Sequence, residues 1–213
     1  MSLLVKEIYP AIIGEGIYSG FSGLIIRLTG CNLNCAYCDT RYARSGGRWW
    51  QVGNLLKLVE EKDFEKILIT GGEPLLQPEV IEFIQTLLKR KKQVLLETNG
   101  SLSLKKVPQK THIIMDLKTP GSGEEASNCY ENLNFLKPSD EVKIVLTDYK
   151  DYLWAKKIIQ EKKLEKRFLV SLSPAWGMLA PEKLARWLLK DRLKVRLNLQ
   201  IHKFIFPGRE RRI

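Results

Sequence analysis

The sequence is poor in the residue types that usually build metal sites or disulfide frameworks, since its 213 residues include only four cysteines and two histidines. It has no run of about 18 uncharged apolar residues, the length expected of a transmembrane helix. Lys6 and Glu7 interrupt the region where a signal peptide would keep its apolar core. We therefore expect a cytoplasmic protein with no membrane partner. Because no low-complexity linker or repeat divides the chain, we expect a single domain over residues 1–213.

Negative charge is also scarce, because 24 Asp and Glu stand against 35 Lys and Arg and give a formal net charge of +11. Such an excess can indicate a nucleic acid, an anionic ligand or an acidic partner protein. The lysines are spread over helical stretches such as residues 89–92 and 161–163, without a basic stripe interleaved with aromatic residues. We favour a solvated basic surface and expect no nucleic-acid partner.

Short β-rich runs alternate with amphipathic stretches of helical spacing along most of the chain. The β-rich runs cover residues 23–28, 66–70, 93–97, 112–116, 141–146, 167–171 and 194–199. The helical stretches lie near residues 49–62, 78–91, 150–163 and 180–190. This order predicts parallel βαβ units, and therefore an α/β fold built as a barrel or as an open sheet.

Polar clusters close four of the β-rich runs. They are TGGEP at residues 70–74, ETNG at 97–100, DLKTP at 116–120 and SLSP at 171–174. The carboxyl ends of parallel strands share one rim, where ligands of such folds bind. Any one of these clusters is weak evidence, but their common position predicts a single site.

Three of the four cysteines lie within eight positions, in the sequence GCNLNCAYCDT at residues 30–40. Clustered thiols in a reducing compartment favour metal binding. A structural zinc site needs four ligands, and neither Cys129 nor the two histidines has companion spacing. A [4Fe–4S] cluster held by three thiolates would leave one iron open to a small molecule that carries an amine and a carboxylate. The polar neighbours Asn32, Asn34 and Asp39 argue against cysteines that are merely buried, and we expect Cys129 to serve packing.

The spacing C-x3-C-x2-C after the first of these β-rich runs, with TGGEP after the next one, resembles the radical S-adenosylmethionine (SAM) superfamily. The resemblance implies a [4Fe–4S] cluster on Cys31, Cys35 and Cys38, with SAM as the second cofactor. It also implies an incomplete, modified (β/α)6 partial barrel. In that superfamily the cluster passes an electron to SAM, and the resulting 5′-deoxyadenosyl radical abstracts a hydrogen from the substrate.

A narrower resemblance rests on GEGIYSG at residues 14–20, IRLTGCNL at 26–33, YCDT at 37–40 and NLQIHK at 198–203. Together these segments resemble the 7-carboxy-7-deazaguanine synthase family of queuosine and deazapurine biosynthesis. The resemblance implies a carbon–nitrogen lyase that converts 6-carboxy-5,6,7,8-tetrahydropterin to 7-carboxy-7-deazaguanine with loss of ammonia, aided by Mg²⁺. It further implies a homodimer, reduced by a flavodoxin or a ferredoxin.

The same resemblance assigns site residues. On the substrate side it places Ile12, Ile13, Gly14, Glu15, Arg27, Thr70 and His202. On the SAM side it places Tyr37, Asp39, Gly72, Glu73, Asp116, Lys118 and Ser173, and it makes Thr40 the Mg²⁺ ligand.

These residue types suit their expected roles. The carboxylate of Glu15 can accept the guanidine-like N–H edge of a pterin, and Arg27 can hold a substrate carboxylate by two charge-assisted contacts. The hydroxyl of Thr40 offers Mg²⁺ a hard oxygen ligand. Simpler interpretations remain for three residues: a surface ion pair for Arg27, a helix cap for Thr40, and for His202 a core histidine bonded to a backbone carbonyl.

The chain also departs from the family pattern. Ile13 replaces a common glutamine, Tyr37 replaces a common tryptophan, and residues 116–118 read DLK where relatives often have SPK. Some relatives end at a proline whose terminal carboxylate reaches the site, whereas this chain continues past Pro207, so that role is not transferred. Two rival functions stay open: a glycyl-radical-enzyme activase, and a non-catalytic iron–sulfur or zinc protein that binds nucleic acid.

Overall fold

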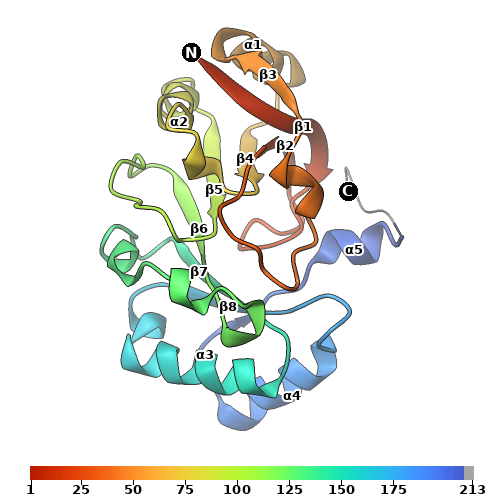
Figure 1. Cartoon of the computed structure of the whole chain (residues 1–213), viewed down its shortest axis with the longest axis vertical. Coiled ribbons are helices and arrows are strands. Elements are labelled where there is room, and N and C mark those ends of the chain that lie inside the picture. The colour runs from red at the N-terminus through yellow and green to blue at the C-terminus, as the bar shows by residue number, and fades with distance from the viewer. Residues whose placement is uncertain (209–213) are drawn as a thin grey trace.

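The computed structural model describes residues 1–208, so that residues 209–213, the end of the tail past Pro207, lie outside the described part. Its strands form one nine-stranded sheet in the order β3-β1-β2-β4-β5-β6-β7-β8-β9 (Figure 1). The strands are β1 (Ser2–Ile12), β2 (Ser22–Leu28), β3 (Arg48–Gln51), β4 (Lys66–Gly71), β5 (Gln93–Thr98), β6 (His112–Leu117), β7 (Glu141–Leu146), β8 (Leu169–Pro174) and β9 (Arg196–Leu197).

The sheet is parallel from β2 to β9 and antiparallel only where β1 pairs with β2 and β3. Its two edges, β3 and β9, do not pair with each other, so the barrel is incomplete. This arrangement confirms the predicted α/β class. The last predicted strand is much shorter than expected, because only Arg196 and Leu197 of residues 194–199 pair with β8.

Four α-helices confirm the predicted helical stretches and a fifth follows the last strand. They are α1 (Val52–Lys62), α2 (Val80–Lys89), α3 (Tyr149–Glu161), α4 (Pro181–Asp191) and α5 (Ile201–Ile205). Short 3₁₀ helices cover η1 (Arg41–Arg44), η2 (Pro74–Leu76), η3 (Pro120–Ser122), η4 (Glu125–Ser127), η5 (Tyr130–Asn134) and η6 (Leu164–Lys166). None of the helices within residues 1–208 combines the length and the apolar character needed to cross a membrane.

The prediction of a helix from residue 49 was wrong at its start, because residues 48–51 form the edge strand β3 instead. Trp50 pairs with Leu3 of β1, a strand that the sequence analysis missed. β1 alternates buried and half-buried side chains along its first eight residues, which is the pattern of a strand with one covered face.

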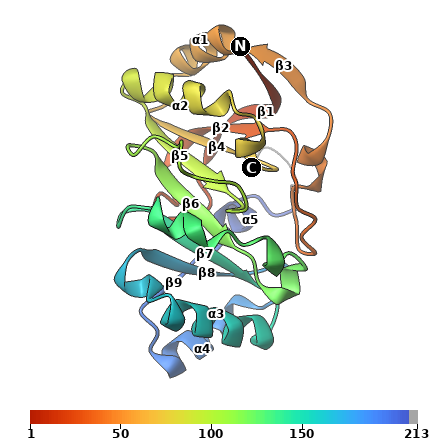
Figure 2. The ribbon, with the colours of Figure 1, turned by 60° about the vertical axis from the view of Figure 1, so that its left-hand side comes forward.

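The two faces of the sheet differ in chemistry. On the outer face, alternate strand residues such as Ile26, Ile69 and Leu96 pack against helix residues such as Phe83 and form the main core. Figures 1 and 2 show α1 and α2 beside the first strands and α3 and α4 beside the last ones, whereas α5 lies on the opposite side. Within residues 1–208 the inner face has a small apolar cluster around the middle of the strands, with Ile25, Leu68, Leu95 and Ile114. Its carboxyl ends therefore remain available for polar side chains.

Candidate active site

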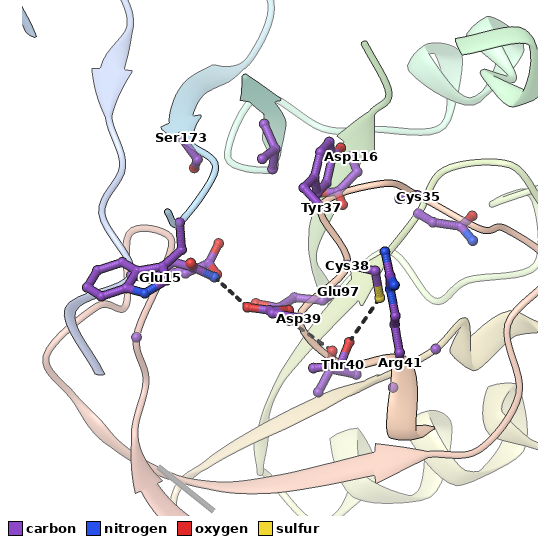
Figure 3. Close-up of a pocket in the computed structure, with 18 of the residues that line it drawn as sticks. Glu15, Cys35, Tyr37, Cys38, Asp39, Thr40, Arg41, Glu97, Asp116 and Ser173 are labelled. Carbon is purple, nitrogen blue, oxygen red and sulfur yellow. Dashed lines mark hydrogen bonds between the residues drawn. The ribbon is translucent and has the colours of Figure 1, made fainter. Parts of the chain in front are cut away.

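A cavity of about 880 Å³ opens over the inner face, at the carboxyl ends of the parallel strands. All predicted site residues line it except Ile13 and Glu73. Figure 3 shows Glu15, Asp39, Asp116 and Ser173 around one space, with Cys38 and Thr40 on its wall. The structure therefore brings together residues that are separated by more than 150 positions in the sequence.

Strand register explains why these side chains share the cavity. Successive residues of a strand point to opposite faces, and the core residue Ile26 precedes Arg27 on β2. Arg27 is aligned with Thr70 of β4, and Asp116 of β6 is aligned with Lys143 of β7. The polar side chains of neighbouring strands thus form adjacent rows on the cavity floor.

The cysteine loop leaves β2 and packs directly on the TGGEP turn. The amide of Glu73 donates to Gly30 O at 2.7 Å. A Cβ atom on Gly72 would lie 2.1 Å from Gly30 O and 2.6 Å from Cys31 Cβ, so only glycine permits this contact. The close packing fixes the two motifs relative to each other.

The three clustered cysteines suit a [4Fe–4S] cluster. All of them are unpaired and all line the cavity. Within residues 1–208, no three His, Cys, Asp or Glu side chains gather closely enough to hold a single metal ion. Each thiolate of an iron–sulfur cluster binds a different iron, so the sulfur atoms need not converge on one point. Burial raises the pKa of the Cys35 thiol, a cost that coordination of the thiolate to iron would offset.

Glu73 turns its side chain away from the cavity. Its fully buried carboxylate accepts hydrogen bonds from Leu75 N (3.0 Å), Asn99 N (2.7 Å) and Thr98 Oγ1 (2.9 Å). Burial raises the pKa of this carboxyl, and the hydrogen bonds oppose that rise. The carboxylate therefore links the TGGEP and ETNG motifs, and the SAM contact of Glu73 stays a prediction for its backbone atoms.

Ile13 is likewise buried, in the small inner cluster with Tyr9 and Ile25. Its backbone is occupied by hydrogen bonds with Phe21 and Gly20. The predicted substrate contact of Ile13 stays a prediction, and its neighbours Ile12 and Gly14 reach the cavity instead.

Arg27 forms an ion pair inside the protein and not at its surface. Its Nε lies 2.8 Å from Glu7 Oε1, and its Nη2 donates to Tyr9 Oη at 3.2 Å. Burial disfavours the charge, but the contacts with Tyr9, Tyr42 and Glu7 hold the pKa of Arg27 above its ordinary value. The guanidinium is thus charged and held in place, as an anchor for a substrate carboxylate must be.

Thr40 stands before η1, yet its side chain makes no cap hydrogen bond. Its hydroxyl lies 3.9 Å from Cys38 Sγ, on the cavity wall. The helix-cap interpretation therefore does not account for this side chain.

The end of the chain folds back over the first loop. Ile201 N donates to Gly14 O at 3.0 Å, and a Cβ on Gly14 would lie 1.7 Å from the Nδ1 of His202. Burial lowers the pKa of His202, so its ring is neutral near pH 7. Within residues 1–208 the ring of His202 makes no hydrogen bond, which does not support the carbonyl-bonded core histidine considered above.

On the SAM side, Tyr37 and Lys118 lie together, with the ammonium of Lys118 5.9 Å from the ring centre of Tyr37. The hydroxyl of Tyr37 is buried and has no hydrogen-bond partner in the described chain. Lys118 Nζ is 2.6 Å from Asp116 Oδ2. Burial raises the pKa of Asp116, but Lys118 and Lys143 outweigh it and hold that pKa below its ordinary value. An orphaned hydroxyl and a fixed carboxylate are groups that a polar nucleoside ligand can use.

Sequence reasoning missed two charged residues of the cavity floor, the buried Lys143 and the half-buried Glu97. Lys143 Nζ lies 3.0 Å from Glu15 Oε2 and 3.4 Å from Asp116 Oδ1. Glu97 accepts a hydrogen bond from Thr70 Oγ1 at 2.9 Å, and burial raises its pKa. The signal for Glu97 was its place in the ETNG cluster, whereas a lysine within a β-rich run gave no such signal.

Comparison with known proteins gives concordant matches. The profile of the Radical SAM superfamily matches residues 25–122. A 7-carboxy-7-deazaguanine synthase of Koribacter versatilis is 40% identical over 217 residues, which cover 95% of this chain and 96% of the relative. One of Chlorobaculum tepidum is 38% identical over 207 residues, with coverages of 96% and 94%.

Solved structures share the fold. The crystal structure of QueE from Escherichia coli matches with a TM-score of 0.77 at 19% identity, covering 94% of each chain. The structure of Streptococcus suis SuiB bound to S-adenosylmethionine matches with a TM-score of 0.54 at 12% identity, covering 79% of this chain and 44% of that one. At these identities the structural matches speak for the fold alone.

Proposed function

Because the chain belongs to the family of 7-carboxy-7-deazaguanine synthases, we propose that it converts 6-carboxy-5,6,7,8-tetrahydropterin to 7-carboxy-7-deazaguanine with loss of ammonia. As a radical SAM enzyme it uses a [4Fe–4S] cluster and SAM. The observation that best supports the proposed substrate is the cavity itself, which is lined both by the three cysteines and by Glu15 and Arg27. The activase and the nucleic-acid-binding alternatives are not favoured by these relatives.

The residues of the chain divide the work. Cys31, Cys35 and Cys38 would hold the cluster, and the cluster and SAM supply, when bound, one-electron cleavage of a C–S bond followed by hydrogen abstraction. Glu15 would accept the N–H edge of the pterin and so orient the ring. Arg27 would hold the substrate carboxylate with the guanidinium edge that Glu7 and Tyr9 leave available.

We propose that Thr40 contributes an oxygen to a Mg²⁺ ion shared with the substrate. The support is chemical: a hydroxyl without a cap bond faces the cavity beside Cys38. Mg²⁺ keeps several waters and commonly takes only one or two protein oxygens together with substrate oxygens. A single threonine is therefore a sufficient protein ligand.

A flavodoxin or ferredoxin as reductant and a homodimeric assembly are also proposals. The net charge of +11 favours an acidic electron carrier. Arg41 and Arg44 of η1 border the cysteine loop, since Arg41 donates to Ala36 O at 2.8 Å and Arg44 to Asn34 Oδ1 at 2.6 Å. These two arginines place positive charge where a carrier would approach the cluster.

The test is an anaerobic reaction. The enzyme is reconstituted with iron and sulfide, supplied with SAM, Mg²⁺, dithionite and 6-carboxytetrahydropterin, and its products are identified by mass spectrometry. We expect 7-carboxy-7-deazaguanine. If 5′-deoxyadenosine forms but the pterin stays intact, the enzyme carries out radical SAM chemistry and the proposed substrate is wrong.

Two cysteine variants give a matched comparison in the same assay. Cys31→Ala removes a predicted cluster ligand and is expected to abolish turnover, with loss of the cluster absorbance. Cys129→Ala removes the one cysteine that does not line the cavity, and this variant should keep both the turnover and the cluster absorbance of the wild type. Equal activity of the two variants would contradict the assignment of the cluster ligands.

A further inference from the structure

The carboxylate of Glu15 is held by three side-chain donors from the far strands and the chain end. Lys143 Nζ lies 3.0 Å from its Oε2, and Asn198 Nδ2 lies 3.4 Å from the same oxygen. Gln200 Nε2 donates to its Oε1 at 2.8 Å. These contacts tie Glu15 to the far side of the cavity, although it lies in the loop between β1 and β2.

Each of these donors also contacts a residue predicted to bind SAM. Lys143 lies 3.4 Å from Asp116 Oδ1. The other two contacts are Asn198 Nδ2 to Ser173 Oγ (2.8 Å) and Gln200 Nε2 to Asp39 Oδ2 (3.2 Å). The substrate side and the SAM side of the cavity are thus joined through shared hydrogen-bond donors.

Lys143 is the one charged donor of the three, and its surroundings keep it charged. It is 9% exposed, and it stands in β7 directly beside Asp116 of β6. Burial disfavours the ammonium, but Asp116, Glu15 and Glu97 together raise the pKa of Lys143 well above its ordinary value. A buried ammonium between two carboxylates contributes a stronger and more specific tie than a neutral amide.

We propose that Lys143 is a positioning residue that couples the binding of SAM to the binding of the pterin, because its single ammonium holds Glu15 on one side and Asp116 on the other. The inference rests on the proposed function. A ligand that orders Glu15 or Asp116 also orders the Lys143 ammonium between them. The ammonium then lies in the position from which it holds the other carboxylate. The second ligand then finds its contact residue already ordered, so that each ligand strengthens the binding of the other by the same factor.

The experiment measures that factor with the cluster-loaded enzyme. Without a reductant SAM is not cleaved, so its dissociation constant can be measured by anaerobic equilibrium dialysis with and without 6-carboxytetrahydropterin. In the wild type we expect the pterin to tighten SAM binding about 10-fold, within the usual range for coupled sites. Lys143→Met, which keeps much of the side-chain length without the charge, should bring the factor to about 1.

Two further variants make the result specific to the bridging charge. Lys143→Arg keeps a cation that can reach both carboxylates and should restore most of the coupling. Lys157→Met removes a lysine of the exposed pair with Glu161 and should leave the factor as in the wild type. If Lys143→Met does not fold, Lys143→Gln replaces it, because glutamine keeps an amide donor but carries no charge.

Undiminished coupling in the uncharged variant, or a wild type without coupling, would overturn the inference. A wild type that neither binds nor converts the pterin would instead contradict the proposed function. If the wild type converts the pterin but Lys143→Met still shows the coupling, the proposed function stands and the proposed role of Lys143 is wrong.

Discussion

At the scale of single residues, Gly72 decides whether the cysteine loop and the TGGEP turn can touch. A methyl group there would meet Gly30 O and the side chain of Cys31. We expect Gly72→Ala to lower the free energy of unfolding by about 1–3 kcal/mol, as overpacking does, and to lower the iron bound per chain. Chemical denaturation and iron analysis measure these two effects.

Gly53→Ala is the matched control for this substitution. Gly53 lies within α1, and a Cβ there would meet nothing within 4 Å. Because Gly53 is the second residue of the helix, alanine should not lower the free energy of unfolding and should leave the iron content unchanged. A Gly72→Ala variant that behaves like this control would show that the contact between the cysteine loop and the TGGEP turn can accommodate a methyl group.

Residue identities in the site were largely predictable from the sequence, but the direction of each side chain was not. The cysteine spacing predicted Cys31, Cys35 and Cys38 as cluster ligands, the family resemblance predicted Thr70 and Asp116, and all five residues line the cavity. Glu73 was assigned to SAM, yet its carboxylate bonds the protein, because a motif does not show which atoms face the ligand. Lys143 was missed because its orientation depends on register with β6, which the sequence alone does not fix.

At the scale of elements, the loop between β1 and β2 is held to the far edge of the sheet by hydrogen bonds from its backbone amides to two side chains. Gly16 N donates to Asn198 Oδ1 at 2.9 Å, and Ile17 N donates to Glu141 Oε1 at 2.8 Å. Glu141 is fully buried and also bonds His112 Nε2 at 3.1 Å. This loop carries Glu15, so its attachment to β7 determines where the Glu15 carboxylate lies in the cavity.

The hydrogen bonds of Glu141 make the free energy of unfolding depend on pH, and the sign of this dependence follows from the pKa of its carboxyl. Burial raises the pKa of this carboxyl, but the hydrogen bonds from His112 and Ile17 outweigh burial and hold the pKa below its ordinary value. Its stabilising effect is therefore complete above the pKa of the unfolded chain, about 4.3, and is lost as the pH falls through the folded pKa. We expect Glu141→Gln to flatten the fall in unfolding free energy below about pH 5 and to raise the KM for the pterin.

Denaturant titrations from neutral to acid pH measure this effect, with Glu161→Gln as the control. Glu161 is exposed on α3 and pairs only loosely with Lys157 at 3.8 Å. Its removal should leave both the acid slope and the KM as in the wild type. Parallel acid slopes for Glu141→Gln and the wild type would show that Glu141 does not set the stability at low pH.

Periodicity predicted most elements because the main core imposes it. The four long helices and the parallel strands each bury one regular set of side chains on the outer face. β1 and β3 were missed because both are antiparallel additions to the edge of a parallel sheet, outside the alternation of strand and helix that guided the prediction. α5 was missed because its five residues are too few to show a helical period, and none of them is buried.

At the scale of the whole molecule, the excess of positive charge makes the rate of electron delivery a test of the proposed reductant. Arg41 and Arg44 border the cysteine loop and add to the attraction of an acidic carrier. Salt screens such attraction over about 8 Å at physiological ionic strength. We expect the rate constant for cluster reduction by a reduced flavodoxin to fall about 10-fold or more between about 0.02 and 0.5 M salt.

Charge reversal locates the effect on the surface. Arg44→Glu inverts a charge beside the cysteine loop and should slow reduction at low salt while changing it little at high salt. Lys157→Glu makes the same change on α3, at a residue that does not line the cavity, and should slow reduction much less. Stopped-flow absorbance of the cluster follows both variants. Charge that guides the carrier must act through both salt screening and proximity to the cluster. Reduction rates that do not depend on salt, or that fall equally in the two variants, would therefore mean that the carrier does not use the basic surface beside the cluster.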